Sequence, residues 1–148
     1  MLMESHSDLM GSASSIIIPD RFNKKAVLWL LKIDGRLAGY RWTIANNHST
    51  PTYFPHTETD VHSIDVEIFS DFRGQHILQY FKAIVEDTLR KEGFKRHYSE
   101  TYLWNRHAVK AILKTGLMTM GIATRFSIFG KNIVIWHEMS DKIKFTSL

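Results

Sequence analysis

The turn at Arg73-Gly74 separates a strand-like segment from a helix-like one, and it could bind an anion. A strand that feeds directly into a helix through a glycine turn leaves backbone N–H groups free at the start of the helix. Those donors, together with the positive end of the helix dipole, suit a phosphate group. The stretch Ile64–Lys91 therefore predicts either a phosphate site or a simple connection between two elements.

Carboxylates on both sides of that helix could act as a general base. Asp65 and Glu67 lie two residues apart, so an extended strand would present them on one face. Glu100 lies five residues before Asn105, in the segment that follows the helix. Burial raises the pKa of a carboxylate, which would make any of the three a better proton acceptor. A solvated strand face or a structural ion pair would explain the same residues without chemistry.

The histidines and the absence of cysteine argue against metal chemistry. The chain has eight histidines and no cysteine, which excludes a disulfide framework, a thiolate metal site and a cysteine nucleophile. No two histidines have the H-x-x-x-H spacing of a helical zinc site. We therefore predict no metal and interpret the histidines as surface residues. His76 is the exception, because it lies at the proposed phosphate turn.

Composition describes a globular chain that is mildly basic. Of 148 residues, 44% are hydrophobic and 23% are charged, and the net charge is +4 at pH 7. This length suits one domain with its own core. The basic residues form no dense cluster, so nucleic-acid binding is not expected. No apolar run reaches the ~18–20 residues of a membrane helix, and the N-terminus lacks a secretory signal, so we expect a cytoplasmic protein.

Strand-like segments precede the chemical residues. Val27–Ile33 and Leu37–Ile44 are largely apolar, and Asp34-Gly35 between them predicts a hairpin with a type I′ turn. Residues 1–23 are rich in small and polar side chains between Ser5 and Ser15. We expect them to form a mostly flexible N-terminal segment, with Ile16–Ile18 as a short strand.

The first two candidate carboxylates belong to a segment with strand periodicity. Apolar and polar residues alternate along Ser63–Phe69, which predicts a strand with two unlike faces. The expected apolar face holds Ile64, Val66 and Ile68, and the expected polar face holds Ser63, Asp65 and Glu67. We therefore expect both carboxylates to share a face with Ser63.

A helix follows the turn and leads into the second half of the chain. It is predicted from about Gln75 to Lys91, with Phe81, Ile84 and Val85 in its apolar stripe and Gly93 as its stop. The later elements are a strand at Arg96–Trp104, a helix at Arg106–Lys114 capped by Asn105, and strands at Ile122–Phe129 and Asn132–Glu138. The order β-β-β-α-β-α-β-β predicts an α+β fold, in which helices flank one mixed α/β sheet.

Three of these stretches together resemble the GCN5-related N-acetyltransferase (GNAT) superfamily. Val66–Leu78 is similar to the family's acyl-CoA motif, a strand followed by Q/R-x-x-G-x-G/A at the start of a helix. Gly93–Asn105 is similar to a glycine and a strand that ends in Asn, and Asn105–Leu117 resembles the N-x-x-A…K-x-G-F signature. The resemblance implies an acyl-CoA N-acyltransferase fold and a single domain over residues 24–148.

The resemblance also implies a cleft for acyl-CoA between two parted strands. In the family, amides of the turn hold the diphosphate, and a backbone N–H near the strand end meets the thioester carbonyl. Carried over by motif position, the cofactor-binding residues would be Ile68, Phe69, Arg73, Gly74, Gln75, His76, Ile77, Leu78 and Asn105. The implied candidates for the catalytic base are Glu100 and Glu67.

The implied reaction is transfer of an acyl group to a primary amine by direct attack. The donor would be acetyl-CoA or another acyl-CoA, without a metal, and the acceptor would be a small-molecule amine or a protein amine. A chain without cysteine agrees with a reaction that forms no covalent enzyme intermediate.

The sequence departs from the family pattern at several positions. His76 and Leu78 occupy positions where the family has Gly and Gly or Ala, and Ile112 stands where many members have a Tyr acid. Only residues 1–26 precede the first hairpin, where the family normally has a strand and two helices. These departures leave a second interpretation open, a GNAT-fold module that has lost catalysis and binds an acyl-CoA or a protein partner. Apolar sheet left uncovered by the short N-terminus makes a homodimer plausible.

Overall fold

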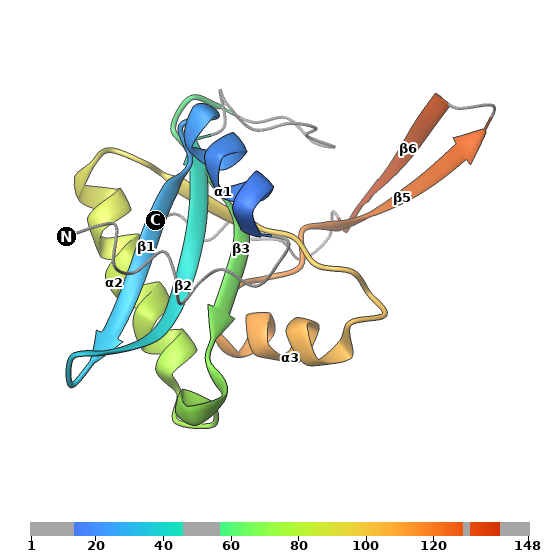
Figure 1. Ribbon diagram of the computed structural model, residues 1–148. Helices are drawn as coiled ribbons and strands as arrows, with labels where there is room; N and C mark the ends of the chain where they lie inside the picture. Colours follow the sequence, from blue (N-terminus) through green and yellow to red (C-terminus); the bar gives the residue numbers. More distant parts are fainter. Residues whose placement is uncertain (1–13, 46–56, 129–130, 140–148) are drawn as a thin grey trace.

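The computed structural model describes residues 14–45, 57–128 and 131–139, and its centre is a four-stranded sheet. The strands, in spatial order, are β1 (Val27–Ile33), β2 (Arg36–Ala45), β3 (Asp60–Ile68) and β4 (Arg96–Ser99). The first three run antiparallel to their neighbours, whereas β3 and β4 are parallel (Figure 1). A mixed sheet with helices against it confirms the predicted α+β class.

The turn between β1 and β2 has the conformation that the sequence predicts. Asp34 and Gly35 have φ angles of 50° and 77°. A type I′ turn requires positive φ at both central residues, and its twist matches that of the flanking strands. The hairpin prediction is therefore confirmed.

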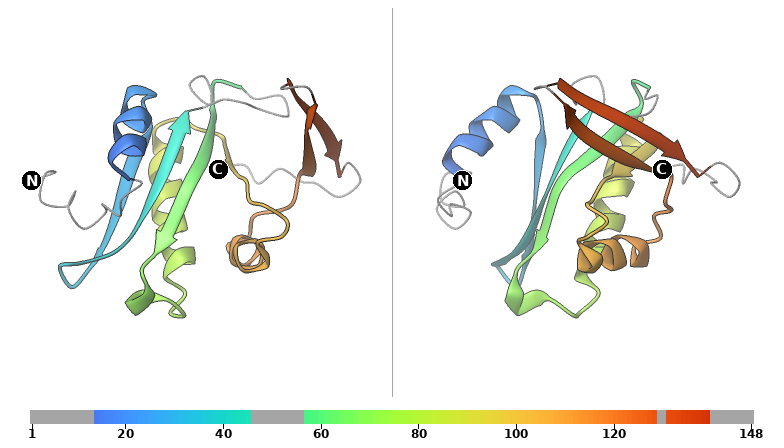
Figure 2. Two further views of the ribbon diagram at one scale, coloured as in Figure 1. Left: turned by 45° about the vertical axis from the view of Figure 1, so that its right-hand side comes forward. Right: turned by 90° about the vertical axis from the view of Figure 1, so that its right-hand side faces the viewer.

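Two helices cover opposite faces of the sheet (Figure 2). Helix α1 (Ser14–Asn23) lies on one face and helix α2 (Ile77–Lys91) lies on the other. The helix at residues 14–23 contradicts the expected strand at Ile16–Ile18. The rest of the expected flexible segment lies outside the described residues.

The core on the α1 side explains why this segment is helical. Ile18 packs with Ala26, Trp42 and Ile44 into a buried cluster. A run of isoleucines favours a strand in isolation, but local propensity is weak compared with burial against a sheet. Packing on Trp42 therefore outweighs the β preference of the run.

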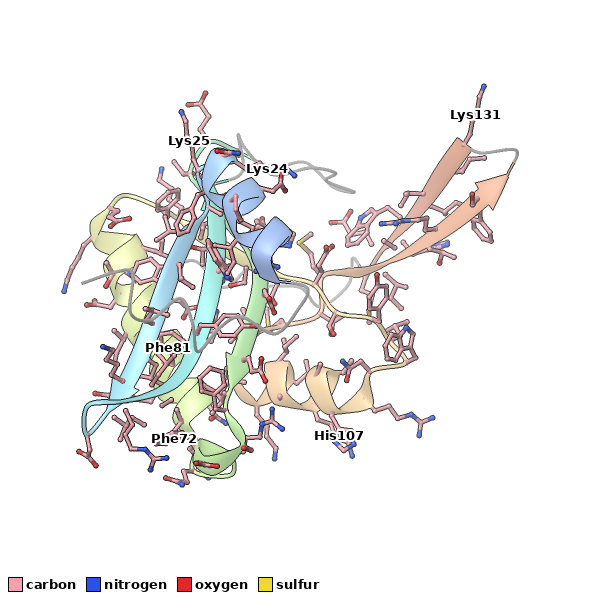
Figure 3. All side chains as sticks on the ribbon, viewed as in Figure 1. Lys24, Lys25, Phe72, Phe81, His107 and Lys131 are labelled. Carbon is pink, nitrogen blue, oxygen red and sulfur yellow. The ribbon has the colours of Figure 1, made fainter. Side chains whose placement is uncertain are left out.

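The core on the α2 side rests on a narrow stripe of the helix. Phe81, Val85 and Leu89 are spaced four residues apart and are buried together with Val61 of β3. Figure 3 shows Phe81 where α2 lies against the sheet. Ile84, which the sequence periodicity assigns to the same stripe, is 44% exposed. The apolar stripe is thus narrower than predicted.

A β-bulge at Ile64 changes the faces of β3. Ser63 and Asp65 lie opposite consecutive residues of β2, so Ile64 has no partner in that register. An extra residue shifts the alternation of side chains by one position. Ser63 therefore faces α2, whereas Asp65 and Glu67 lie on the α1 side, where Asp65 pairs with Arg21. The prediction that the three residues share a face is wrong.

The last third of the chain differs most from the prediction. Strand β4 ends at Ser99 rather than at Trp104, and it is followed by helix α3 (Arg106–Lys114). Strands β5 (Gly121–Ile128) and β6 (Lys131–Glu138) form a separate two-stranded sheet. Within the described residues neither of them pairs with β1–β4, so the single sheet expected from the sequence is wrong. The four residues of β4 offer too short an edge to align such long strands.

Asp60 anchors the first residues of both β3 and β4. Its carboxylate is fully buried and accepts hydrogen bonds of 2.8 Å from Nε and from Nη2 of Arg96. Thr57 adds one bond from its backbone N–H and one from its hydroxyl. Burial alone would raise the pKa of Asp60, but these hydrogen bonds outweigh burial and hold the pKa below its ordinary value.

We expect Asp60→Asn to lower the free energy of unfolding by about 2–4 kcal/mol, because Arg96 would lose its buried counter-charge. Urea unfolding at neutral pH, followed by circular dichroism, measures this change. Asp71→Asn is the matched control, since the Asp71–Arg36 pair is exposed and such pairs contribute about 0–1 kcal/mol. Equal losses in the two variants would contradict the anchoring role of Asp60.

Candidate functional site

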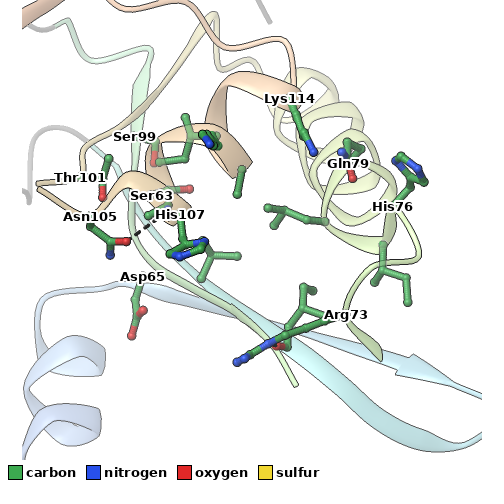
Figure 4. Close-up of a pocket in the computed structure, with 18 of the residues that line it drawn as sticks. Ser63, Asp65, Arg73, His76, Gln79, Ser99, Thr101, Asn105, His107 and Lys114 are labelled. Carbon is green, nitrogen blue, oxygen red and sulfur yellow. Dashed lines mark hydrogen bonds between the residues drawn. The ribbon is translucent and has the colours of Figure 1, made fainter. Parts of the chain in front are cut away.

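A cleft opens where β3 and β4 part. Their pairing ends at Ser63 and Ser99, whereas β3 continues to Ile68. Beyond Ser63, no strand among the described residues pairs with the outer edge of β3. The resulting cleft has a volume of about 720 Å³ and is lined by this edge, by the turn before α2, and by α3 (Figure 4). The parted strands are those that the GNAT resemblance implies.

The open edge of β3 presents peptide groups of alternate residues. The N–H of Phe69 donates to the carbonyl of Ala38 in β2 at 2.9 Å, so it points away from the cleft. Successive peptide groups of a strand point to opposite edges, which leaves those of Val66 and Ile68 directed at the cleft. Of the two predicted oxyanion donors, Ile68 is therefore oriented for that role and Phe69 is not.

The turn between β3 and α2 offers a row of unengaged amides. From Gly74 to Leu78, no N–H donates to another group in the described part of the chain. Gly74 and His76 both have positive φ, of 80° and 58°, and the first turn of α2 contains no acidic residue. Free amides in a turn and at a helix start can converge on one point and form an anion-binding concavity. Phosphate binding by Gly74, Gln75, His76, Ile77 and Leu78 stays a prediction that this geometry supports.

His76 stands where the GNAT motif that the sequence resembles has a glycine, and its backbone has a conformation that favours glycine. His76 precedes α2 with φ 58° and ψ 16°, the left-handed conformation. This conformation costs roughly 1–2 kcal/mol for a residue with a Cβ and almost nothing for glycine. The backbone at His76 therefore has a conformation that glycine adopts readily, although this residue has a Cβ. The imidazole is exposed and lines the cleft.

Basic side chains surround the end of the cleft at which α2 begins. Arg73, Lys110 and Lys114 all line it, and Figure 4 shows Arg73, His76 and Lys114 around this end. Arg73 donates to the carbonyl of Ile68 at 2.8 Å, which fixes its guanidinium beside the end of β3. Lys114 is the Lys of the K-x-G-F signature, but the sequence analysis did not assign it to the cleft. Its signal is the four-residue spacing from Lys110, which puts both cations on one face of α3.

The three candidate carboxylates differ in their position relative to the cleft and in their hydrogen-bond partners. Glu100 lines the cleft, is exposed and makes no ion pair with any described residue. Glu67 does not line the cleft, and its oxygens contact the hydroxyl of Tyr40 and Nη2 of Arg73, both at 3.3 Å. Asp65 does line it, but it accepts a hydrogen bond of 3.1 Å from Arg21. The structure thus brings Glu100 to the site and leaves Glu67 beside it.

Tyr40 links the two carboxylates on the α1 side. Its hydroxyl lies 3.4 Å from Asp65 and 3.3 Å from Glu67. Burial raises the pKa of Tyr40, and the negative charges of Asp65 and Glu67 raise it further. Tyr40 therefore stays protonated and donates to these carboxylates.

Asn105 serves first as a helix cap. Its side-chain oxygen accepts a hydrogen bond of 3.1 Å from the N–H of Ala108, which confirms the predicted cap of α3. Asn105 also lines the cleft (Figure 4). The cap orients the first turn of α3, so Asn105 shapes this wall of the cleft whether or not it contacts a ligand.

A buried polar chain lies under the point where the strands part. Ser63 Oγ is 2.7 Å from Nε2 of His97, and Nδ1 of His97 is 2.8 Å from Glu86. Lys82 donates to Glu86 at 2.7 Å, and Arg41 donates to Ser63 at 3.1 Å. Sequence reasoning missed this chain, because its members come from β2, β3, β4 and α2. The interpretation of the histidines as surface residues is wrong for His97, which is buried. The only local signal is the four-residue spacing of Lys82 and Glu86.

The chain of contacts joins β4 to β3 and α2. Burial lowers the pKa of His97, so its ring is neutral, with one N–H donor and one acceptor nitrogen. The Glu86 carboxylate can only accept, so Nδ1–H donates to Glu86 and Nε2 accepts from the Ser63 hydroxyl. Burial would raise the pKa of Glu86, but hydrogen bonds from His97 and Lys82 outweigh burial and lower it. A neutral imidazole between a hydroxyl and a carboxylate holds the last paired residues of β4 in place.

The described residues contain no group of three or more His, Cys, Asp or Glu side chains that could hold a metal ion. None of their helices is long and apolar enough to cross a membrane.

Comparison with known proteins places the fold. No protein-family model matches the sequence, and no curated protein matches it closely. The solved structure of YycN from Bacillus subtilis superposes with a TM-score of 0.56 and 18% identity over 70% of this chain. This chain spans 62% of the length of that structure.

Two further solved structures are acetyltransferases by name. The ribosomal-protein-alanine N-acetyltransferase of Brucella melitensis superposes with a TM-score of 0.54 and 12% identity, over 86% of this chain and 77% of its own. The aminoglycoside acetyltransferase AAC(6')-Ib, solved with coenzyme A, gives a TM-score of 0.57 and 9% identity, over 80% and 69%. The chain therefore has the GNAT acetyltransferase fold that its motifs predicted.

We expect the free energy of unfolding to fall as the pH is lowered below about 6.5. Burial lowers the folded-state pKa of His97 and of His62, so the unfolded chain binds protons first. The stabilisation that each neutral histidine contributes is fully present above its unfolded-state pKa of about 6.5 and is lost as the pH falls to its folded-state pKa. For each histidine, the free energy of unfolding falls by at most ~1.4 kcal/mol for every pH unit in this range. Urea unfolding over a series of pH values measures the slope.

His97→Gln is expected to flatten this dependence, because it removes one of the two groups. The exposed His107, changed to Gln, is the control and should leave the slope as it is. A slope that His97→Gln does not reduce would show that His97 contributes nothing to it.

Proposed function

We propose that the protein is an acyl-CoA-dependent N-acyltransferase that transfers an acyl group, most simply acetyl, to a primary amine by direct attack. The observation that carries this proposal is the open edge of β3 beside the unengaged amides of Gly74–Leu78. An amide-rich thioester with a diphosphate at its far end needs both features within one cleft. The fold shared with acetyltransferases supports the same conclusion.

Each part of the cleft suits a part of the co-substrate. Amides of Gly74–Leu78 would hold the diphosphate, with Arg73 and Lys114 supplying positive charge. The peptide group of Val66, at the open edge, would pair with the amides of the pantetheine arm as an added strand does. The N–H of Ile68 would donate to the thioester carbonyl and stabilise negative charge that develops there. The co-substrate itself supplies the activated acyl group.

Glu100 is the proposed general base, and Glu67 is the second candidate. Glu100 lines the cleft and has no competing partner in the described ranges, whereas Glu67 is engaged by Tyr40 and Arg73. A base must lie within reach of the proton it removes, directly or through one water. Glu100 follows the last residue of β4 and lines the cleft that the amine would enter, which supports this assignment.

The acceptor is proposed to be an amine of a small molecule or of a protein. AAC(6')-Ib was solved with coenzyme A and kanamycin, and the Brucella protein is named for an alanine of a ribosomal protein. These names supply the amine class as a starting panel for assay.

A binding module without catalysis is the second candidate. Ile112 lines the cleft on α3, at the position where many family members have the acid that protonates the leaving thiolate. An aliphatic side chain donates no proton, which is the observation that favours this alternative. The thiolate of a departing coenzyme A can also leave unprotonated or take a proton from water, so the enzyme remains the leading proposal.

We expect CoA to bind, and His76→Gly to tighten binding by about 3–10-fold, because glycine adopts the left-handed conformation freely and admits the diphosphate closer to the amides. Isothermal titration calorimetry with CoA measures both. His107→Ala, a cleft histidine on α3 away from the turn, is the control and should change binding little. Weaker binding in His76→Gly would show that the imidazole is a ligand. No heat at millimolar CoA would refute the proposed site.

We expect wild-type protein to release free thiol from acetyl-CoA in the presence of primary amines, and Glu100→Gln to reduce kcat by about 100-fold or more. The pH–rate profile of Glu100→Gln should also lose its acidic limb, since the titrating base is gone. Glu67→Gln is the matched control and should retain most of the rate. CoA binding without turnover on any amine would favour the module instead.

A further inference from the structure

The buried polar chain contains a hydroxyl, an imidazole and a carboxylate in succession. Ser63 Oγ lies 2.7 Å from Nε2 of His97, and Nδ1 of His97 lies 2.8 Å from Glu86. The ring is neutral and carries its proton on Nδ1, so Nε2 is free to accept the proton of Ser63. An activated serine requires this tautomer, because the base must be unprotonated at the nitrogen that faces the hydroxyl.

Three elements hold these groups in place. His97 pairs with Val61, two residues before Ser63, so the side chains of His97 and Ser63 lie on the same face of the sheet. Glu86 comes from α2, which covers this face, and Lys82 donates to its carboxylate at 2.7 Å. The hydroxyl, the ring and the carboxylate are therefore held in order by two neighbouring strands and one helix.

Ser63 lies at the wall of the cleft. It is one of the lining residues, at the closed end where β3 and β4 part (Figure 4). Its hydroxyl donates its one proton to His97 and accepts a hydrogen bond of 3.1 Å from Nη1 of Arg41. A hydroxyl oxygen has two lone pairs, so one of them remains for attack on a carbonyl carbon.

Arg41 supplies a donor that the structure leaves unused. Arg41 is 4% exposed, and its Nε has no hydrogen-bond partner among the described residues. A buried donor without an acceptor costs about 1–3 kcal/mol, and a network that served only to hold β4 in place would not need it. Attack by Ser63 would create an oxyanion beside this guanidinium, and Nε would donate to it.

We propose that Ser63, His97 and Glu86 form a catalytic site that hydrolyses short-chain carboxylic esters through an acyl-serine intermediate. Ser63 Oγ forms a bond to the ester carbonyl carbon while its proton passes to Nε2 of His97. The bond to the leaving alkoxide then breaks, and the alkoxide takes that proton. Water attacks the acyl-serine in the same way, giving a proton to His97 that returns to Ser63 as the carboxylic acid leaves. Glu86 is a positioning residue that orients the ring.

This activity is separate from the proposed transfer to amines. The N–H of Ile68, which is proposed to bind the thioester carbonyl, lies five positions after Ser63 on β3, which is about 15 Å along a strand. A thioester bound at Ile68 therefore does not reach Ser63. Because Ser63 is only 4% exposed, it is accessible to a small acyl group such as acetyl and not to a bulky one.

Hydrolysis of p-nitrophenyl acetate tests the proposal, because this ester needs neither CoA nor an amine. Wild-type protein should release p-nitrophenolate with an initial burst, and Ser63→Ala should lower kcat/KM by about 100-fold or more. Ser99→Ala is the matched control and should keep the wild-type rate, since Ser99 pairs with Ser63 and lines the same cleft. Mass spectrometry of peptides from the quenched enzyme should find the acetyl group on Ser63.

A fluorophosphonate probe tests the serine without relying on the stability of a variant. The probe bonds to activated serines, so it should label Ser63 in native wild-type protein and in Ser99→Ala, but not in urea-unfolded protein. Glu86→Gln should slow hydrolysis and move the ring proton of His97 toward Nε2, which 15N NMR of the imidazole detects. Absence of label on native Ser63, or hydrolysis that Ser63→Ala leaves unchanged, overturns the proposal. Neither result bears on acyl transfer, which is assayed with acetyl-CoA and amines.

Discussion

The separation of β3 from β4 is the constraint on which the rest of the site depends. The two strands pair over four positions and then part, and the paired end is held from both sides. The bidentate contact of Arg96 with buried Asp60 ties the first residues together. The bonds of His97 to Ser63 and Glu86 tie the last residues to each other and to α2. Because the strands are fixed up to this point, the edge of β3 beyond it stays available for a ligand.

The turn after β3 has a left-handed backbone at a residue that is not glycine. Gly74 and His76 both have positive φ, and His76 stands where the GNAT motif that the sequence resembles has glycine. Five consecutive amides remain without partners in the described chain, and basic residues of the turn and of α3 surround them. The electrostatics of an anion site therefore depend on backbone and dipole more than on the residue types that motif matching compares.

One inserted residue changes the surroundings of two candidate acids. The bulge at Ile64 leaves Ser63 on the α2 side and moves Asp65 and Glu67 to the α1 side. On that side, Tyr40 and Arg73 donate hydrogen bonds to Glu67, and Arg21 donates one to Asp65. Because β4 ends at Ser99, Glu100 lies outside the paired strand and its side chain remains exposed in the cleft. These placements separate residues that look equivalent as candidate bases in the sequence.

The sequence by itself determined the α+β class, the Asp34-Gly35 turn, the cap at Asn105 and the glycine turn at Gly74, because each depends on local periodicity or on the conformational preference of one or two residues. Only the tertiary structure decided the rest. Burial of Ile18 against Trp42 made a helix of a predicted strand. The bulge, the short β4 and the chain from Arg41 to Lys82 arise from contacts between segments far apart in sequence, which no local pattern encodes. The same reason left the hairpin of β5 and β6 outside the predicted sheet: strand pairing depends on which edge is available in space.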